Sequence, residues 1–339
     1  MGKKIKETKI KKNMDKNIQK APDYQQDPHL SVETKKGLKV LNSGDPVETL
    51  PVDKARKVLI DAQAGSRVDL SGIEESEKTI SVDNYTIKLN IIRPEGAKEK
   101  LPVFIFIHGG GWVLGDYPTH QRLVRDLVVE SGFASVFVNY TPSPEAHYPQ
   151  AINEIYAATK WVAEHGDEIN VDGKRLAVVG NSVGGNMTIV TSLMSKKNNG
   201  PQIKLQILMW PVANAGFDSD SYKMYGEQRF LTTPLMKWMF DQYTTDMQKR
   251  KEIYLSPLQA SVEELQNLPP TLIEVAENDI LRDDAEALGR KLDEAGVDVT
   301  TLRYNGVIHD FGMLNIYAEI PQTRTLISTS AAALKRYLK

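Results

Sequence analysis

A serine between two glycines is the first candidate for covalent chemistry in this sequence. Ser182 stands in the pattern G-N-S-V-G at 180–184, after the apolar run 176–179 and before a helical stretch. A serine on so tight a strand-to-helix turn is lifted above the sheet, near the positive end of the following helix, where its hydroxyl can attack a substrate. The alternative is a glycine-rich turn in which Ser182 only caps the helix, because this pattern alone is a weak signal.

A run of three glycines supplies a second element of the same chemistry. The sequence H-G-G-G-W at 108–112 follows the apolar run 103–107. Bare backbone N–H groups let a substrate oxygen approach closely, and one such donor stabilises the charge that develops in acyl transfer by about 3–4 kcal/mol. A loosened dinucleotide-binding fingerprint is the alternative. It is disfavoured because residues 115–118 indicate a continuing loop and no acidic residue ends the next strand.

The general base and its orienting acid are expected downstream of the serine. The partners of a nucleophile on such a turn follow in the order acid, then histidine, and His309 is the only one of six histidines beyond Ser182. Asp279 ends the predicted strand 271–276 and is the expected acid, which holds the His309 tautomer and stabilises the imidazolium. Glu277 is the alternative acid.

Three nearby aspartates receive other interpretations. Asp283 and Asp284 open a predicted helix, where acidic residues favour the positive end of the helix and cap its first turn. Asp310 follows His309 in the predicted loop 306–311 and is expected to point elsewhere.

Short apolar runs alternate with helical stretches in much of the chain. Strands that alternate with helices of ten or more residues predict right-handed crossovers and a mostly parallel sheet. An alternating pair at 79–82 and 85–92 predicts an antiparallel edge. The other predicted strands are 103–107, 134–138, 176–179, 205–209, 272–275 and 297–304, and the predicted helices are 52–64, 120–130, 152–165, 184–195, 283–295 and 322–338.

Two segments lie outside this alternation. Residues 1–76 are polar and partly helical, and no apolar run follows the lysine-rich stretch 3–20, which favours a frayed, partly disordered start over a signal peptide. Residues 213–255 are rich in aromatic residues and Met, which predicts an extra helical layer that also caps the site. We therefore predict one catalytic domain, 77–339, with a cap insertion and an N-terminal segment that contributes to the cap.

Composition excludes several classes of function. The chain has 339 residues, a net charge of −2 and no cysteine, which excludes disulfides, thiolate zinc sites and cysteine nucleophiles. Its charge balance gives no pull toward nucleic acid, and no apolar stretch is long enough to span a bilayer. No H-E-x-x-H pattern or histidine cluster indicates a metal site. We expect no nucleic-acid partner, no stable membrane insertion, no metal and a cytoplasmic location.

The motifs together resemble the hormone-sensitive-lipase-like bacterial esterases, the α/β-hydrolase fold-3 group of acetyl-esterase type. The resemblance covers roughly residues 78–339. It implies the α/β-hydrolase fold: a mostly parallel central sheet flanked by helices, with a helical cap. It also implies hydrolysis of short-chain acyl esters without a cofactor, and it allows a homodimer. The matching stretches are 108–112, 139–145, 180–185, 268–270, 279–283 and 309–311.

The resemblance also implies the remaining site residues. It places the oxyanion donors at the N–H groups of Gly110, Gly111 and Val183. Trp112 and Phe311 flank the motifs and are expected either to line the substrate pocket or to pack in the core or cap.

Four positions depart from the pattern of the family. Asn181 and Val183 replace the usual Asp and Ala, and the branched Val183 is expected to narrow the acyl pocket. Thr141 replaces the usual Arg, which is expected to leave Glu145 without a partner. Asp310 replaces the usual Gly and puts a charge beside the base, which is expected to raise the pKa of His309.

These observations predict a serine carboxylesterase that acts on small ester substrates through Ser182, His309 and Asp279, by way of an acyl-enzyme. One alternative is a non-catalytic small-molecule-binding protein of the same fold, which the presence of all three residues disfavours. Amide or peptide hydrolysis by the same triad is the other.

Overall fold

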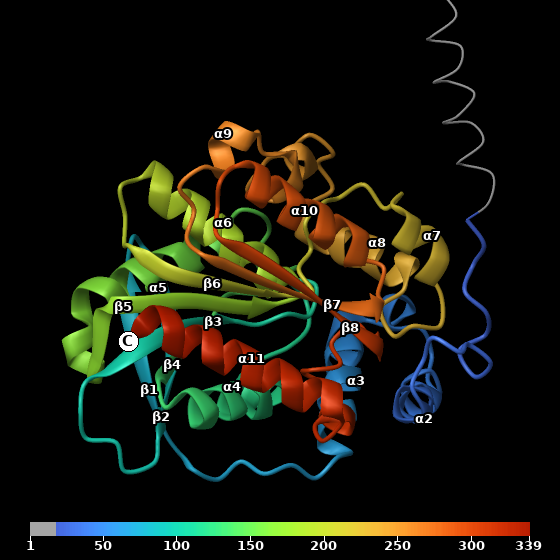
Figure 1. The fold of residues 1–339 in the computed structure, drawn as a ribbon, viewed down its shortest axis with the longest axis horizontal. Helices are drawn as coiled ribbons and strands as arrows, with labels where there is room; N and C mark the ends of the chain where they lie inside the picture. The colour runs from blue at the N-terminus through green and yellow to red at the C-terminus, as the bar shows by residue number, and fades with distance from the viewer. Residues whose placement is uncertain (1–17) are drawn as a thin grey trace, which may run out of the picture.

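The computed structural model describes residues 18–339 and is built around one eight-stranded sheet (Figure 1). The strands are β1 Ile73–Val82, β2 Tyr85–Pro94, β3 Leu101–Ile107, β4 Ala134–Asn139, β5 Val171–Asn181, β6 Ile203–Met209, β7 Thr271–Asn278 and β8 Val299–Ile308. Their order in the sheet is β1-β2-β4-β3-β5-β6-β7-β8. β2 pairs antiparallel with both β1 and β4, and the other neighbours are parallel, so the sheet is mostly parallel with an antiparallel edge.

Helices cover both faces of the sheet. The α-helices are α2 Val32–Leu41, α3 Val52–Ala64, α4 Tyr117–Ser131, α5 Gln150–His165, α6 Val183–Lys197, α7 Asp220–Tyr225, α8 Thr233–Tyr243, α9 Val262–Leu265, α10 Arg282–Glu294 and α11 Pro321–Leu338. Short 3-10 turns are η1 Val47–Thr49, η2 Gly166–Ile169, η3 Lys249–Lys251, η4 Pro257–Gln259 and η5 Asn315–Tyr317. α4 and α11 pack side by side on one face, and α5, α6 and α10 line the other (Figure 1).

The central strands are buried because both faces of the sheet are covered. Every residue of β3 is buried, and so is the apolar half of β5 from Leu176 to its end. This double burial is the reason that these strands appear in the sequence as continuous apolar runs instead of alternating ones. The parallel strands all end at the same edge of the sheet, which brings the segments that follow β3, β5, β7 and β8 close together.

The predicted fold class is confirmed, but two predicted loop boundaries are wrong. Residues 306–308 continue β8, because the register between β7 and β8 shifts near the end of β7 and Ile308 then pairs with Asn278. Residues 117–118 already belong to α4. Asp116 caps this helix by accepting a hydrogen bond from the Thr119 N–H, and a proline in the first turn suits the helix start.

The N-terminal segment contacts the insertion 213–255, which contains α7 and α8 (Figure 1). The Ala21 N–H donates to the Met224 carbonyl at 3.0 Å. Arg229 donates to the Asp27 carboxylate at 2.7 Å, and both side chains are buried. Residues 1–17, which hold most of the lysine-rich start predicted to be frayed, lie outside the described residues.

Within residues 18–339, none of the helices combines the length and the apolar character that crossing a bilayer requires.

Candidate active site

Ser182 occupies a sharp turn between β5 and α6, in a backbone conformation that side chains rarely adopt. Its φ is 57° and its ψ is −121°, and such strain costs on the order of 1–3 kcal/mol. Glycine at 184 makes the turn possible, because a Cβ there would overlap the Ile107 carbonyl oxygen at the end of β3. Ser182 itself is 4% exposed. The turn thus aims the hydroxyl at the edge of the sheet where β3 and β8 end.

His309 and Asp279 meet Ser182 at this edge. His309 directly follows β8, and its Nε2 lies 3.0 Å from Ser182 Oγ. Its Nδ1 lies 2.7 Å from Asp279 Oδ2, just beyond the end of β7. With Nδ1–H donating to the carboxylate, Nε2 is free to accept the serine proton. The other Asp279 oxygen accepts the Leu281 N–H at 3.0 Å, which fixes the carboxylate. The structure therefore brings together the three residues that the sequence predicted as a triad.

The electrostatic environment favours the protonated form of His309. Burial by itself lowers the pKa of this imidazole, but the charges of Asp279 and Asp310 and the hydrogen bond to Asp279 together outweigh burial, so that the pKa lies above its ordinary value. Two carboxylates therefore stabilise the imidazolium form of His309.

Asp310 faces the base, so the prediction that it points elsewhere is wrong. Its Oδ2 lies 3.7 Å from His309 Nε2. The two residues share a side because the chain has left β8 at Ile308 and turns with a φ of 60° at Asp310. In a continuing strand, consecutive side chains would have pointed to opposite faces.

The other nearby acids have different partners. Glu277, the alternative orienting acid, contacts His29 Nδ1 at 3.0 Å and the Gly306 N–H at 2.8 Å. Asp283 accepts the Ser221 N–H at 2.8 Å, which ties the start of α10 to α7. Asp284 lies in the first turn of α10, where burial raises its pKa to about 6. None of the three contacts His309 in these interactions, whereas Asp279 hydrogen-bonds to its Nδ1.

The glycine loop after β3 lies beside Ser182. The Gly109 N–H donates to Asn181 Oδ1 at 3.0 Å, which joins the loop to the turn that carries the serine. Within residues 18–339, the N–H groups of Gly110, Gly111 and Val183 have no hydrogen-bond acceptor. A Cβ at Gly111 would overlap the Met239 side chain, so α8 packs directly over this loop. Three backbone donors near Ser182 are therefore left without an acceptor within the described residues, and their role as an oxyanion site stays a prediction.

Comparison with known proteins places this geometry in a family. The profile of the α/β-hydrolase fold matches residues 104–313. A putative α/β hydrolase of Acanthamoeba polyphaga mimivirus is 34% identical over 306 residues, covering 89% of this chain and 86% of that protein. The ethyl acetate hydrolase of Pseudomonas putida is 30% identical over 271 residues, covering 78% and 85%. A solved thermostable esterase of Pseudomonas putida has 54% identity and a TM-score of 0.91, covering 92% and 98%.

The chain belongs to the α/β-hydrolase fold-3 family. Its named relatives and structural neighbours include esterases and carboxylesterases. The predicted family and the predicted enzyme class, a carboxylic ester hydrolase, are confirmed by these comparisons.

The two aromatic residues beside the hydrolase motifs are fully buried. Trp112 stacks on Tyr243 of α8 with ring centroids 4.3 Å apart, and meets the edge of Phe240 at 5.0 Å. Phe311 packs against Trp210 at 5.1 Å. These contacts join the glycine loop to α8 and anchor the turn after His309. A direct role of Trp112 and Phe311 in substrate binding stays a prediction.

Arg56 of α3 is the partner of Glu145, so the expectation that Thr141 leaves this carboxylate unpaired is wrong. Two guanidinium nitrogens donate to the Glu145 carboxylate at 2.8 and 2.7 Å, and the hydrogen bond lowers its pKa to about 2. Arg56 also donates to the Val113 carbonyl at 2.9 Å and to the Ser143 carbonyl at 3.0 Å. The arginine comes from the N-terminal segment, where the motif of the family gave no reason to look for it.

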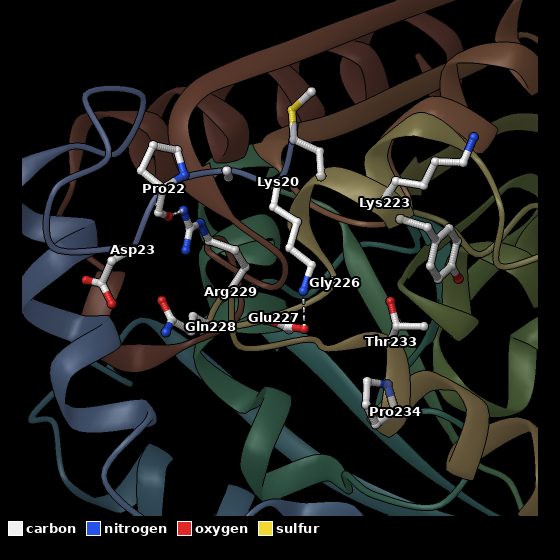
Figure 2. Close-up of a pocket in the computed structure, with 13 residues that line it drawn as sticks. Lys20, Pro22, Asp23, Lys223, Gly226, Glu227, Gln228, Arg229, Thr233 and Pro234 are labelled. Carbon is white, nitrogen blue, oxygen red and sulfur yellow. Dashed lines mark hydrogen bonds and ion pairs between the residues drawn. The ribbon is translucent and has the colours of Figure 1, made fainter. Parts of the chain in front are cut away.

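A cavity of about 530 Å³ lies between residues 20–23 and the chain around α7 and the start of α8 (Figure 2). Figure 2 shows the ion pair of Lys20 with Glu227 within it, and Arg229 reaching toward Pro22. None of the residues predicted for catalysis lines it. Tyr222, which does, packs on Phe217, and Phe217 packs on Phe240 beside the glycine loop.

Sequence reasoning missed two contributors to the site, Trp210 and Arg56. It did predict that the charge of Asp310 raises the pKa of His309, although not that this side chain faces the ring. Trp210 donates its indole N–H to Asp310 at 2.6 Å. It follows β6, and a residue at the end of a parallel strand could have been suspected on position alone. Nothing in the local sequence around Arg56 pointed to a contact 89 residues away.

Proposed function

We propose that this hydrolase is a serine carboxylesterase that cleaves short-chain acyl esters, with Ser182 as nucleophile, His309 as general base and Asp279 as the orienting acid. The observation that carries the proposal is the continuous path from Ser182 Oγ through His309 to Asp279, with steps of 3.0 and 2.7 Å. The ethyl acetate hydrolase among its relatives supports a small ester as the substrate.

The reaction proceeds in two halves. In the first, Ser182 Oγ bonds to the ester carbonyl carbon while its proton moves to His309 Nε2, and the N–H groups of Gly110, Gly111 and Val183 hold the oxyanion. The proton then passes to the leaving alcohol as the C–O bond breaks. A water molecule then attacks the acyl-enzyme carbonyl carbon with His309 again as the base. The carboxylic acid leaves as Ser182 Oγ takes the proton back.

The surroundings of the site favour a small acyl group. Val183 is fully buried at the start of α6, and the Met239 side chain lies against Gly111. Both limit the room for a long chain beside the carbonyl carbon. We assign the cap to the N-terminal segment and the insertion 213–255, on the strength of their mutual contacts through Asp27 and Arg229. A homodimer and a cytoplasmic location stay predictions.

The test is hydrolysis of p-nitrophenyl acetate, butyrate and octanoate at pH 7–8 by the wild type, Ser182→Ala and Ser43→Ala. The last removes an exposed serine after α2 and is the matched control. We expect turnover on acetate and butyrate above that on octanoate, a loss of at least about a thousandfold in Ser182→Ala, and wild-type rates in the control. Equal slow rates in all three proteins would refute the proposal and direct the search to amide substrates or non-catalytic binding.

A further inference from the structure

Asp310 lies in a buried network on the Ser182 side of the His309 ring. Its Oδ2 is 3.7 Å from Nε2, the nitrogen that faces the serine. Its Oδ1 accepts hydrogen bonds from Asn181 Nδ2 at 2.9 Å and from Trp210 Nε1 at 2.6 Å. One carboxylate oxygen is therefore held by two donors, while the other is directed at the base.

The position of this carboxylate is costly for the fold. Asp310 has a φ of 60°, a left-handed conformation that glycine adopts more readily than any other residue. Its side chain is only 7% exposed, and a buried carboxylate is stable only where hydrogen bonds or opposite charges compensate for lost water. The two donors compensate in part, and the imidazolium would complete the set.

The network also reaches the oxyanion loop. Asn181 uses its Nδ2 for Asp310 and its Oδ1 for the Gly109 N–H, 3.0 Å away. Asn181 immediately precedes Ser182, so the nucleophile, the base and the glycine loop are all tied to the same carboxylate. A displacement of Asp310 would therefore change the positions of both the Ser182 hydroxyl and the glycine loop.

We propose that Asp310 is a positioning residue of this hydrolase, which stabilises the proton on His309 Nε2 and, through Asn181, aligns the glycine loop with Ser182. The inference rests on the proposed function. Asp310 accepts no proton itself. The proton travels from Ser182 Oγ to Nε2 and on to the leaving alcohol, while the Asp310 carboxylate stays beside it.

The positions of the charged and titratable groups around His309 allow the effect of Asp310 on the imidazole to be separated from that of Asp279. Asp279 from the end of β7 contacts Nδ1, whereas Asp310 approaches Nε2. Tyr222 of α7 interacts with Asp279 and also with Asp284 of α10. Removing the charge of Asp310 therefore leaves the Nδ1 side of the ring as it is.

The test is the pH dependence of kcat/KM for p-nitrophenyl acetate in wild type and Asp310→Asn. The amide keeps an acceptor for Asn181 and Trp210 but removes the charge. Loss of the negative charge lowers the pKa of His309, so we expect the acidic limb to move to lower pH by about one unit, since a neighbouring opposite charge shifts a pKa by that much or more. We expect the plateau of kcat/KM to fall by about tenfold. An acidic limb at the wild-type pH would overturn the proposal.

Two further variants keep the test decisive. Asp310→Gly suits the backbone conformation, removes the carboxylate and is expected to shift the limb in the same direction if Asp310→Asn does not fold. The double variant Asn181→Asp, Asp310→Asn keeps a carboxylate in the network but moves it off Nε2. Its limb is expected to match that of Asp310→Asn, and recovery of the wild-type limb would contradict the role of position 310. If the wild type itself hydrolysed none of the esters, that result would instead refute the proposed esterase function.

Discussion

Glu274 is a buried carboxyl group in β7, and we expect its ionisation to weaken the fold above neutral pH. The side chain is fully buried. Its two oxygens accept hydrogen bonds from the Tyr304 hydroxyl at 2.8 Å and the Ser330 hydroxyl at 2.7 Å. Burial raises the pKa to about 7, even though these two hydrogen bonds act in the opposite direction.

The size and sign of the effect follow from this pKa. An unfolded chain ionises the same group near 4.5. The folded state retains the proton longer, so the stability contributed by Glu274 is fully present below about pH 4.5 and is lost as the pH rises through about 7. A difference of about 2.5 pKa units corresponds to about 3 kcal/mol. Most of it, about 2–3 kcal/mol, is lost between about pH 5 and pH 8.

The perturbation is Glu274→Gln, which keeps the size and polarity of the side chain but cannot ionise. Urea denaturation at pH 5 and pH 8 gives the free energy of unfolding of each protein. We expect the variant to gain about 2–3 kcal/mol on the wild type between these pH values. Glu294→Gln removes an exposed carboxylate of α10 and is the control, with an expected change near zero. A gain for Glu274→Gln no larger than that of the control would refute the reasoning.

Two further substitutions test how the candidate active site is supported. Arg56→Met removes four hydrogen bonds, and we expect it to lower the free energy of unfolding by about 1–3 kcal/mol and to reduce kcat. Glu145→Gln, which removes only a half-exposed ion pair, should cost under about 1 kcal/mol. Equal losses measured by urea denaturation would contradict this ranking. Gly184→Ala should lower Tm and kcat together, because its Cβ would overlap a backbone carbonyl of β3, whereas Gly44→Ala, with open space around it, serves as the control. An unchanged Tm in Gly184→Ala would show that the turn tolerates a side chain.

The parts of the site that are fixed by strand ends could be predicted from the sequence. Ser182, Asp279 and His309 each follow a strand of the parallel sheet, and parallel strands end at a common edge. Their order along the chain then leaves one histidine to choose. The prediction needed strand positions and chain order but no knowledge of side-chain packing, and the structure brings the three side chains within hydrogen-bond distance.

The contacts made at the positions that differ from the family pattern could not be predicted, because these contacts depend on long-range packing and on local turn geometry. Arg56 reaches Glu145 from a helix that no motif connects to it. The direction of Asp310 depends on where β8 ends. The sequence predicted the end of this strand at 304, whereas pairing resumes at Ile308 after a shift in register. A change of a few residues at a strand end decides which way the next side chains point.

Asn181 and Asp310 are best understood as one feature of the fold and not as two separate departures from the family. Asn181 Nδ2 lies 2.9 Å from Asp310 Oδ1. An aspartate at 181 would bring two buried carboxylates to that distance, and their repulsion would force one of them to take up a proton. An asparagine supplies a donor instead and keeps its other arm on the Gly109 N–H. The amide at 181 thus permits the charge at 310, and the charge at 310 requires a donor at 181. Asn181→Asp alone is therefore expected to lower kcat/KM more than Asn181→Asp made together with Asp310→Asn.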